Sequence, residues 1–253
     1  MKKKDTLLQM VGETQNMSIY RKKNGQYGFR RKTGVDAERL AKDPNFIAIR
    51  QNAKDFGKAG KAGLLIKQAF QPMISKYANS DIFTRLTTLC KEVIKSDATH
   101  ERGFRNLLDG DTNLFTGFEF NPAGMFRTTF IVPITHTIDR VAGTASIVLP
   151  PFVPVEMIVP PEKASHYKLK VGCATLNFDA NAFEFSQTAS EDMPLDDILT
   201  APLTLNFQLP QNTADPVFLA ISIEYQEEEG DFVYPILNSK YNVMKLLAVD
   251  VPA

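Results

Sequence analysis

The spacing of apolar residues changes once along this chain, and that change restricts the fold more than any other feature. Up to about residue 109, apolar side chains recur at three- and four-residue intervals, which is typical of amphipathic helices. From residue 110 the chain is rich in Val, Ile, Thr and Phe in alternating runs cut by Pro and Asn, which is typical of strands. The sequence therefore predicts an α+β protein with its helices before its strands.

The charge divides at the same place. Residues 1–109 hold 22 Lys and Arg against 11 Asp and Glu, a net charge of +11, and residues 110–253 hold 7 against 18, a net charge of −11. The formal net charge of the 253-residue chain is therefore 0. We predict three parts: a basic arm or hairpin over 1–34, a basic helical module over 35–109 and an acidic β-sandwich domain over 110–253.

The first part is basic and contains aromatic residues. Asn24-Gly25 lies between two short runs, and this dipeptide favours a hairpin turn. A disordered arm is the alternative, because so little apolar area cannot offset the entropy cost of ordering. The basic and aromatic residues around the turn are Arg21, Lys22, Lys23, Arg30, Arg31, Lys32, Tyr20, Tyr27 and Phe29.

The second part predicts about four short helices. Asp43-Pro44 is typical of a helix start, since the Asp side chain accepts backbone amide hydrogens and Pro lacks one. We expect a helix over 44–56 that continues or breaks at Gly57. The glycines at 57, 60 and 63 would let a neighbouring backbone approach closely, and two further helices are expected near 81–94 and 100–108.

The third part predicts seven or eight strands at short intervals, which favours an antiparallel sandwich of the immunoglobulin-like kind. Alternate residues over 218–225 should face the core and solvent in turn. Prolines on both sides of 155–159 indicate an edge or linker there. The expected strands are 125–134, 145–149, 167–178, 182–187, 203–209, 217–226, 232–237 and 241–251.

No motif in the chain predicts a particular chemistry. A phosphate-binding GxxxxGK[ST] loop would need Gly and Ser or Thr where Asp55 and Ala62 stand. The three histidines share no metal-ligand spacing, the acidic clusters lack the calcium-loop pattern, and no GxSxG element occurs. Cys90 and Cys173 have no CxxC spacing, so we expect two small buried side chains. We predict no enzyme, no cofactor, no catalytic residue and no metal site.

No segment is apolar enough to predict a membrane span. The lysines at 2–4 resemble the start of a secretion signal, but no apolar stretch of sufficient length follows them. We therefore expect a cytoplasmic protein, with export by a non-standard route as the alternative.

Several short motifs are spread over most of the chain. They are formed by Gly12, Asn16, Ser18, Tyr20, Gly25, Phe29, Arg30, Arg50, Phe56, Ala59, Ala62, Leu65, Ala69, Phe70, Ala164 to Tyr167, Leu195 to Asp197, Tyr234-Pro235, Asn238 and Tyr241-Asn242. These motifs resemble those of a set of uncharacterised Bacteroidota proteins of unknown function. The resemblance implies a β-sandwich preceded by helices and no known activity.

The opposite charges of the modules predict a structural or interaction protein that self-assembles or docks to a protein partner. The modules could instead neutralise each other within one monomer. Two other hypotheses stay open: nucleic-acid binding by the basic arm and helices, and an adhesin-like or carbohydrate-binding sandwich with acidic loops. The candidate interaction residues are Arg21, Lys22, Lys23, Arg30, Arg31, Lys32, Glu227, Glu228 and Glu229.

Overall fold

The computed structural model describes residues 12–13, 17–31, 34–74, 81–230, 232–238 and 240–252. The chain separates into two compact units, Met1–Arg50 and Gln51–Ala253. The boundary falls inside the long helix α2, Ile47–Ala69, and so differs from the predicted boundaries after residues 34 and 109. Among the predicted interaction residues, Lys32 lies outside the described residues.

The first unit contains a three-stranded antiparallel sheet of β1 (Gly12–Glu13), β2 (Met17–Arg21) and β3 (Tyr27–Arg31), in that order. The turn between β2 and β3 closes with two backbone hydrogen bonds, from Lys22 N to Gln26 O at 2.8 Å and from Gly25 N to Lys22 O at 2.9 Å. Gly25 has a φ of 82°, which a residue with a side chain rarely adopts. The hairpin predicted at Asn24-Gly25 is confirmed.

The first unit ends with the first residues of α2. Helix α1, Ala37–Lys42, and the 3-10 turn η2, Pro44–Phe46, precede it. Asp43 caps the turn, since its side chain accepts a hydrogen bond from Asn45 N at 2.9 Å, as predicted. Arg50 donates to Leu40 O at 2.8 Å and to Asp43 O at 2.9 Å, which ties α1 to α2.

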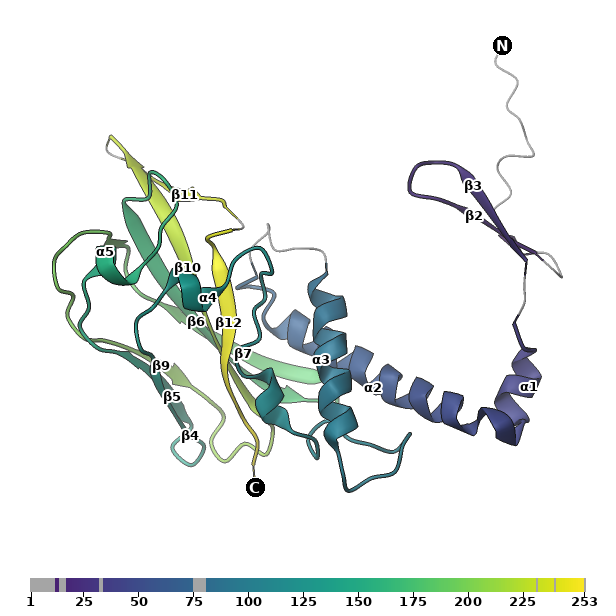
Figure 1. The fold of residues 1–253 in the computed structure, drawn as a ribbon. Helices are drawn as coiled ribbons and strands as arrows, with labels where there is room; N and C mark the ends of the chain where they lie inside the picture. The colour runs from purple at the N-terminus through teal and green to yellow at the C-terminus, as the bar shows by residue number, and fades with distance from the viewer. Residues whose placement is uncertain are drawn as a thin grey trace, which may run out of the picture. The chain divides into compact units, whose positions relative to one another are not determined.

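The second unit is built from two sheets and a helical layer. Helices α2 and α3 (Ile82–Ser96) cover one face of a six-stranded antiparallel sheet, and a three-stranded sheet covers the other face (Figure 1). The larger sheet consists of β6 (His166–Asn177), β7 (Ala182–Ala189), β8 (Met193–Pro194), β10 (Val217–Glu229), β11 (Phe232–Ile236) and β12 (Val243–Asp250). The smaller sheet consists of β4 (Thr135–Asp139), β5 (Thr144–Leu149) and β9 (Leu203–Gln208).

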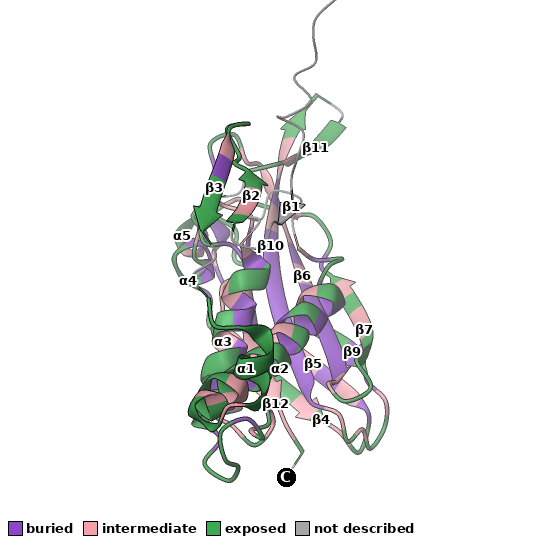
Figure 2. Cartoon of the chain, turned by 90° about the vertical axis from the view of Figure 1, so that its right-hand side faces the viewer, coloured by how far each residue is buried: buried purple, intermediate pink, exposed green. Residues whose placement is uncertain are grey.

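The central strands β6 and β10 are buried on both faces, as Figure 2 shows. Phe218 and Ala220 pack in the core beneath α2 and α3, whereas Leu219, Ile221 and Ile223 pack in the core shared with β5 and β9. The prediction that alternate residues of 218–225 face solvent is therefore wrong. The reason is that the helical layer covers the face that a two-layer sandwich would leave exposed.

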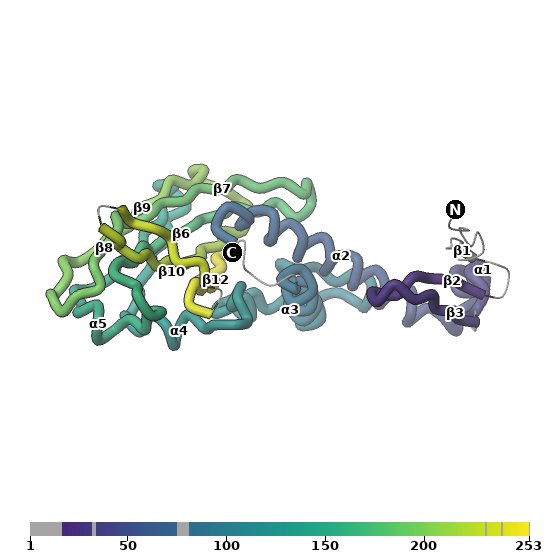
Figure 3. Tube along the Cα trace, turned by 90° about the horizontal axis from the view of Figure 1, so that it is seen from above, coloured from purple at the N-terminus to yellow at the C-terminus, as the bar shows by residue number. Residues whose placement is uncertain are grey.

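Helices α2 and α3 cross on the sheet, and Figure 3 shows α3 end-on beside the length of α2. A Cβ atom added to Gly63 would lie 2.9 Å from Thr87 N, so this glycine permits the close approach of the two backbones. Gly57 and Gly60 have no atom within 4 Å of an added Cβ atom. Only Gly63 of the three glycines therefore has the packing role that their spacing predicts.

Three local predictions need correction. Residues 100–108 form turns instead of a helix, because Gly103 has a φ of 88° and the segment is held by side chains of the helices. Residues 125–134 contain the short helix α4 (Phe126–Thr129) in place of a strand, and residues 155–159 overlap the short helix α5 (Pro154–Met157). Strand β4 was not predicted. Helix α2 continues past Gly57 to Ala69, which is one of the two outcomes expected at that glycine.

The short 3-10 helix η3, Thr112–Phe115, leads from these turns toward the sheet. Its Phe115 is fully buried and packs against Phe218 of β10, with ring centroids 5.4 Å apart. Within the described part of the chain, no helix is both long and apolar enough to cross a membrane.

Candidate functional site

The β2–β3 hairpin gathers aromatic and basic side chains on one face. Its register pairs Arg21 with Tyr27, Ile19 with Phe29 and Met17 with Arg31. Directly opposed residues of an antiparallel pair project to the same face, and alternate residues share that face. Two arginines and two aromatic rings therefore lie on one side of this hairpin, which we call the basic face: Arg21, Tyr27, Phe29 and Arg31.

The basic face is open to solvent. Phe29 is 64% exposed, although Phe is normally a core residue. No ion pair joins the hairpin's described basic residues, Arg21, Lys22, Lys23, Arg30 and Arg31, to any other residue that the structure describes. On the opposite face, Tyr20 covers Gly28, where an added Cβ atom would lie 2.6 Å from Tyr20 Cζ. Uncompensated charge beside exposed rings is typical of a binding surface.

The β10–β11 hairpin has the same construction with the opposite charge. Its register pairs Glu227 with Tyr234 and Glu229 with Phe232. Two carboxylates and two aromatic rings therefore share one side of this hairpin, which we call the acidic face. Phe232 and Tyr234 are both more than half exposed, and their ring centroids lie 6.3 Å apart.

The acidic face is only partly neutralised by its surroundings. Glu227 pairs with Lys163 at 3.4 Å, and Glu228, on the other side of the hairpin, lies 3.9 Å from His166 Nδ1. Glu229 has no ion pair among the described residues. Strand β11 is the last strand in its sheet order, and its hairpin forms a projecting end of the sheet in Figure 1. An edge strand offers unpaired backbone groups as well as side chains.

Three titratable groups cluster beside the helices but serve the fold. Asp97, His100 and Asp109 each have a ligand-type atom within 4.8 Å of the others. The Asp97 carboxylate accepts hydrogen bonds from Thr99 N, Thr99 Oγ1, His100 N and Asn106 N, at 2.7–3.1 Å. Burial opposes the charge of Asp97, but these hydrogen bonds outweigh it and hold its pKa well below the usual range. This cluster therefore closes the loop after α3.

A second charged group, Glu119 of the loop before α4, is partly buried beside β12. Glu119 accepts a hydrogen bond from Phe126 N at 3.0 Å, and Arg85 donates to Glu119 O at 2.6 Å. Burial raises the pKa of Glu119 and lowers the pKa of Lys245, whose ammonium group lies 4.8 Å from the centre of the Phe126 ring. These contacts hold the loop to the sheet.

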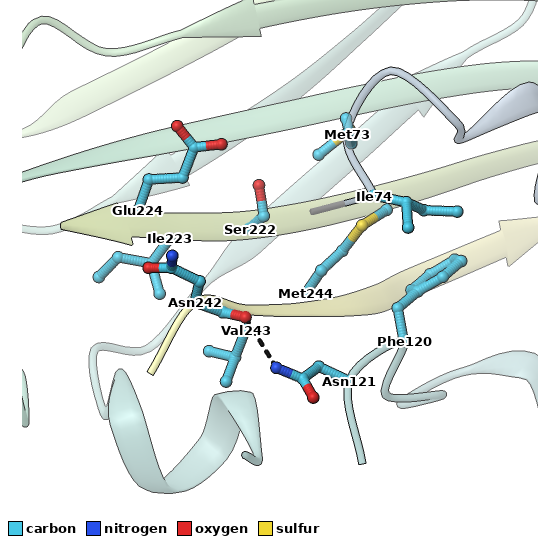
Figure 4. A pocket seen from close by; sticks show the side chains of 10 residues that line it. All are labelled: Met73, Ile74, Phe120, Asn121, Ser222, Ile223, Glu224, Asn242, Val243 and Met244. Carbon is cyan, nitrogen blue, oxygen red and sulfur yellow. Dashed lines mark hydrogen bonds between the residues drawn. The ribbon is translucent and has the colours of Figure 1, made fainter. Parts of the chain in front are cut away.

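The cavity in Figure 4 is too small for a substrate. Its walls come from the segment after α2, the loop at Phe120-Asn121, β10 and β12, and Asn121 Nδ2 donates to Asn242 O at 3.0 Å across one side. The cavity has a volume of about 20 Å³, which is room for one water molecule. Met73, Ile74, Phe120 and Met244 make most of its lining apolar.

Both cysteines are buried and unpaired, as predicted. Burial raises the pKa of each thiol to about 12. A thiolate is the reactive form, so neither Cys90 nor Cys173 is suited to nucleophilic chemistry.

No protein-family model, no curated protein and no solved structure matches this chain. The resemblance to the Bacteroidota set therefore stays a prediction.

The sequence predicted the charged residues of both hairpins but not their aromatic partners on the acidic side. Phe232 and Tyr234 became part of the surface only through their register with Glu229 and Glu227. The Glu-Glu-Glu-Gly run followed by an alternating aromatic strand was the sequence pattern that could have indicated this hairpin.

Proposed function

We propose that this protein is a non-enzymatic assembly protein, in which the basic face of one copy binds the acidic face of another. The observation that supports this most strongly is the matched construction of the two hairpins. Each has two aromatic rings and two like charges on one side, and the charges are opposite between them. Arginine can pair with a carboxylate and can also stack on an aromatic ring. The arginines of the basic face could therefore contact both the carboxylates and the rings of the acidic face.

The charges of the two compact units support the same pairing. Met1–Arg50 holds 12 Lys and Arg against 5 Asp and Glu, a net charge of +7. Gln51–Ala253 holds 17 against 24, a net charge of −7. Opposite fields of this kind speed the encounter of two proteins and set their orientation. Contact between different surfaces of identical copies is head-to-tail, and it produces rings or filaments.

Charge reversal on each face tests the proposal. We expect the variant Arg21→Glu with Arg31→Glu, and separately the variant Glu227→Lys with Glu229→Lys, to be monomeric by light scattering. Mixed together, the two variants retain one intact pair of faces and carry opposite charges on the other pair, so association should return in the mixture. A control that reverses Glu156 and Glu184, exposed acidic residues outside both hairpins, should assemble like the original protein. Assembly that survives either hairpin variant, or a mixture that stays monomeric, would contradict the proposal.

Nucleic-acid binding is a second candidate, and the basic face favours it specifically. Tyr27 and Phe29 share a side with Arg21 and Arg31, and rings between cations suit the stacking of bases beside phosphates. Fluorescence anisotropy with a labelled thymidine oligonucleotide checks this. Phe29→Ala should weaken binding at least several-fold, whereas Phe83→Ala, at an exposed ring on α3, should not. The candidate is excluded if the original protein does not bind the oligonucleotide at low salt.

A further inference from the structure

A hollow between α2, α3 and the loop after α3 concentrates positive charge. It has a volume of about 490 Å³, within the range of about 300–1,000 Å³ that is usual for small-molecule sites. Four basic side chains line it: Lys91 and Lys95 from α3, and Arg102 and Arg105 from the loop. Both hairpins lie outside the lining, so this feature is independent of the proposed assembly.

The loop that carries the two arginines is held firmly to α2. Both carboxylate oxygens of Asp55, which is buried, accept from Gly103 N at 3.1 Å. Lys58 donates to the carbonyl oxygens of Phe104 and Arg105. Gly103 itself lies so close to Gln51 that an added Cβ atom would be 2.9 Å from Gln51 Cγ. The arginines therefore project from a fixed loop, as a preformed site requires.

The four cations have no partner in the described part of the chain. The structure gives no ion pair and no side-chain hydrogen bond to Lys91, Lys95, Arg102 or Arg105 there, and Arg105 Nε is buried without an acceptor. Lys91 and Lys95 are four residues apart on one helix, a spacing at which like charges repel. Asp55 supplies one negative charge against four positive ones, and its oxygens already bind Gly103 N.

We propose that this hollow binds a nucleoside di- or triphosphate. Several negative charges on one ligand would offset the repulsion among the four cations, and phosphate oxygens match the fork of donors on each arginine. Phe56 lines the same hollow and is 55% exposed, so its ring offers a stacking surface for the base.

Isothermal titration of the whole protein with pyrophosphate, ADP, adenosine and a thymidine oligonucleotide tests this. We expect ADP and pyrophosphate to bind and adenosine not to bind. The dissociation constant of ADP should be lower than that of the oligonucleotide. Arg102→Ala and Arg105→Ala should each weaken ADP binding at least tenfold. Lys61→Ala, which removes the same charge from α2 outside this hollow, should leave it unchanged.

Phe56→Ala separates a nucleotide from a simpler phosphate compound. It should weaken ADP binding several-fold and leave pyrophosphate binding unchanged, and an unchanged ADP affinity would overturn the nucleotide assignment. The site itself would be overturned if neither ADP nor pyrophosphate binds, if Lys61→Ala is as harmful as Arg102→Ala, or if only the oligonucleotide binds. Arg102 is exposed, so Arg102→Ala keeps the test valid even if Arg105→Ala fails to fold.

Discussion

At the scale of single residues, a buried charge is tolerated where backbone donors surround it. Asp97 is 2% exposed, and four donors from the following loop converge on its carboxylate. Such hydrogen bonds favour the ionised form and also fix the loop geometry. Nothing in the sequence singled out this residue among the acidic ones, because most of its partners are backbone groups whose positions depend on the fold.

The variant Asp97→Asn should therefore lower stability at neutral pH. The folded-state pKa of Asp97 is below its unfolded value, so its contribution is present above about pH 4 and is lost as the pH falls further. We expect Asp97→Asn to cost about 1.5–3 kcal/mol in urea unfolding at pH 7. The difference from the original protein should shrink below about pH 4. Asp109→Asn, at a more exposed neighbour, should have little effect, and equal losses in both variants would contradict this role.

The two cysteines give a second prediction at this scale. Native protein should not react with a thiol reagent at neutral pH, because burial raises the pKa of Cys90 and Cys173 to about 12 and excludes the reagent. Both thiols should react once urea unfolds the chain, in step with the loss of circular dichroism. Rapid labelling of either thiol in the folded protein would contradict the burial of that cysteine side chain.

At the scale of elements, the sequence was informative where local patterns decide the structure. The Asn24-Gly25 hairpin, the Asp43 cap and most strands of the larger sheet were predictable, since turn chemistry and alternation are local. The double burial of β10 was not predictable, because it depends on α2 and α3 folding onto the sheet. The acidic face was missed for a different reason, since it depends on the cross-strand register that places Phe232 and Tyr234 opposite Glu229 and Glu227.

The contact between α2 and α3 gives a prediction with an internal control. Gly60→Ala should stabilise the protein by about 0.5–1 kcal/mol, because it raises helix propensity in open space. Gly63→Ala should instead destabilise it by about 1–3 kcal/mol, because the new Cβ atom would press on the Thr87 backbone. Urea unfolding of both variants checks this. Equal effects of the two substitutions would mean that the helices are not packed as described.

At the scale of the whole molecule, zero net charge conceals two oppositely charged units, each with a hairpin that exposes aromatic rings. Exposed aromatic rings lower solubility unless a partner covers them. The proposed head-to-tail contact covers both faces at once. The contact depends on exposed charges, so salt should weaken it. Near physiological ionic strength, salt screens the attraction between exposed charges that lie more than about 8–10 Å apart.

The most direct measurement is the molar mass of the purified full chain by light scattering on a sizing column, at low and at high salt. Absorbance at 260 and 280 nm, recorded in the same run, reports any bound nucleic acid. At low salt we expect a species several times heavier than the 28.3 kDa chain and free of nucleic acid, and at high salt we expect it to dissociate toward the monomer. A monomer at every salt concentration would contradict the proposed assembly.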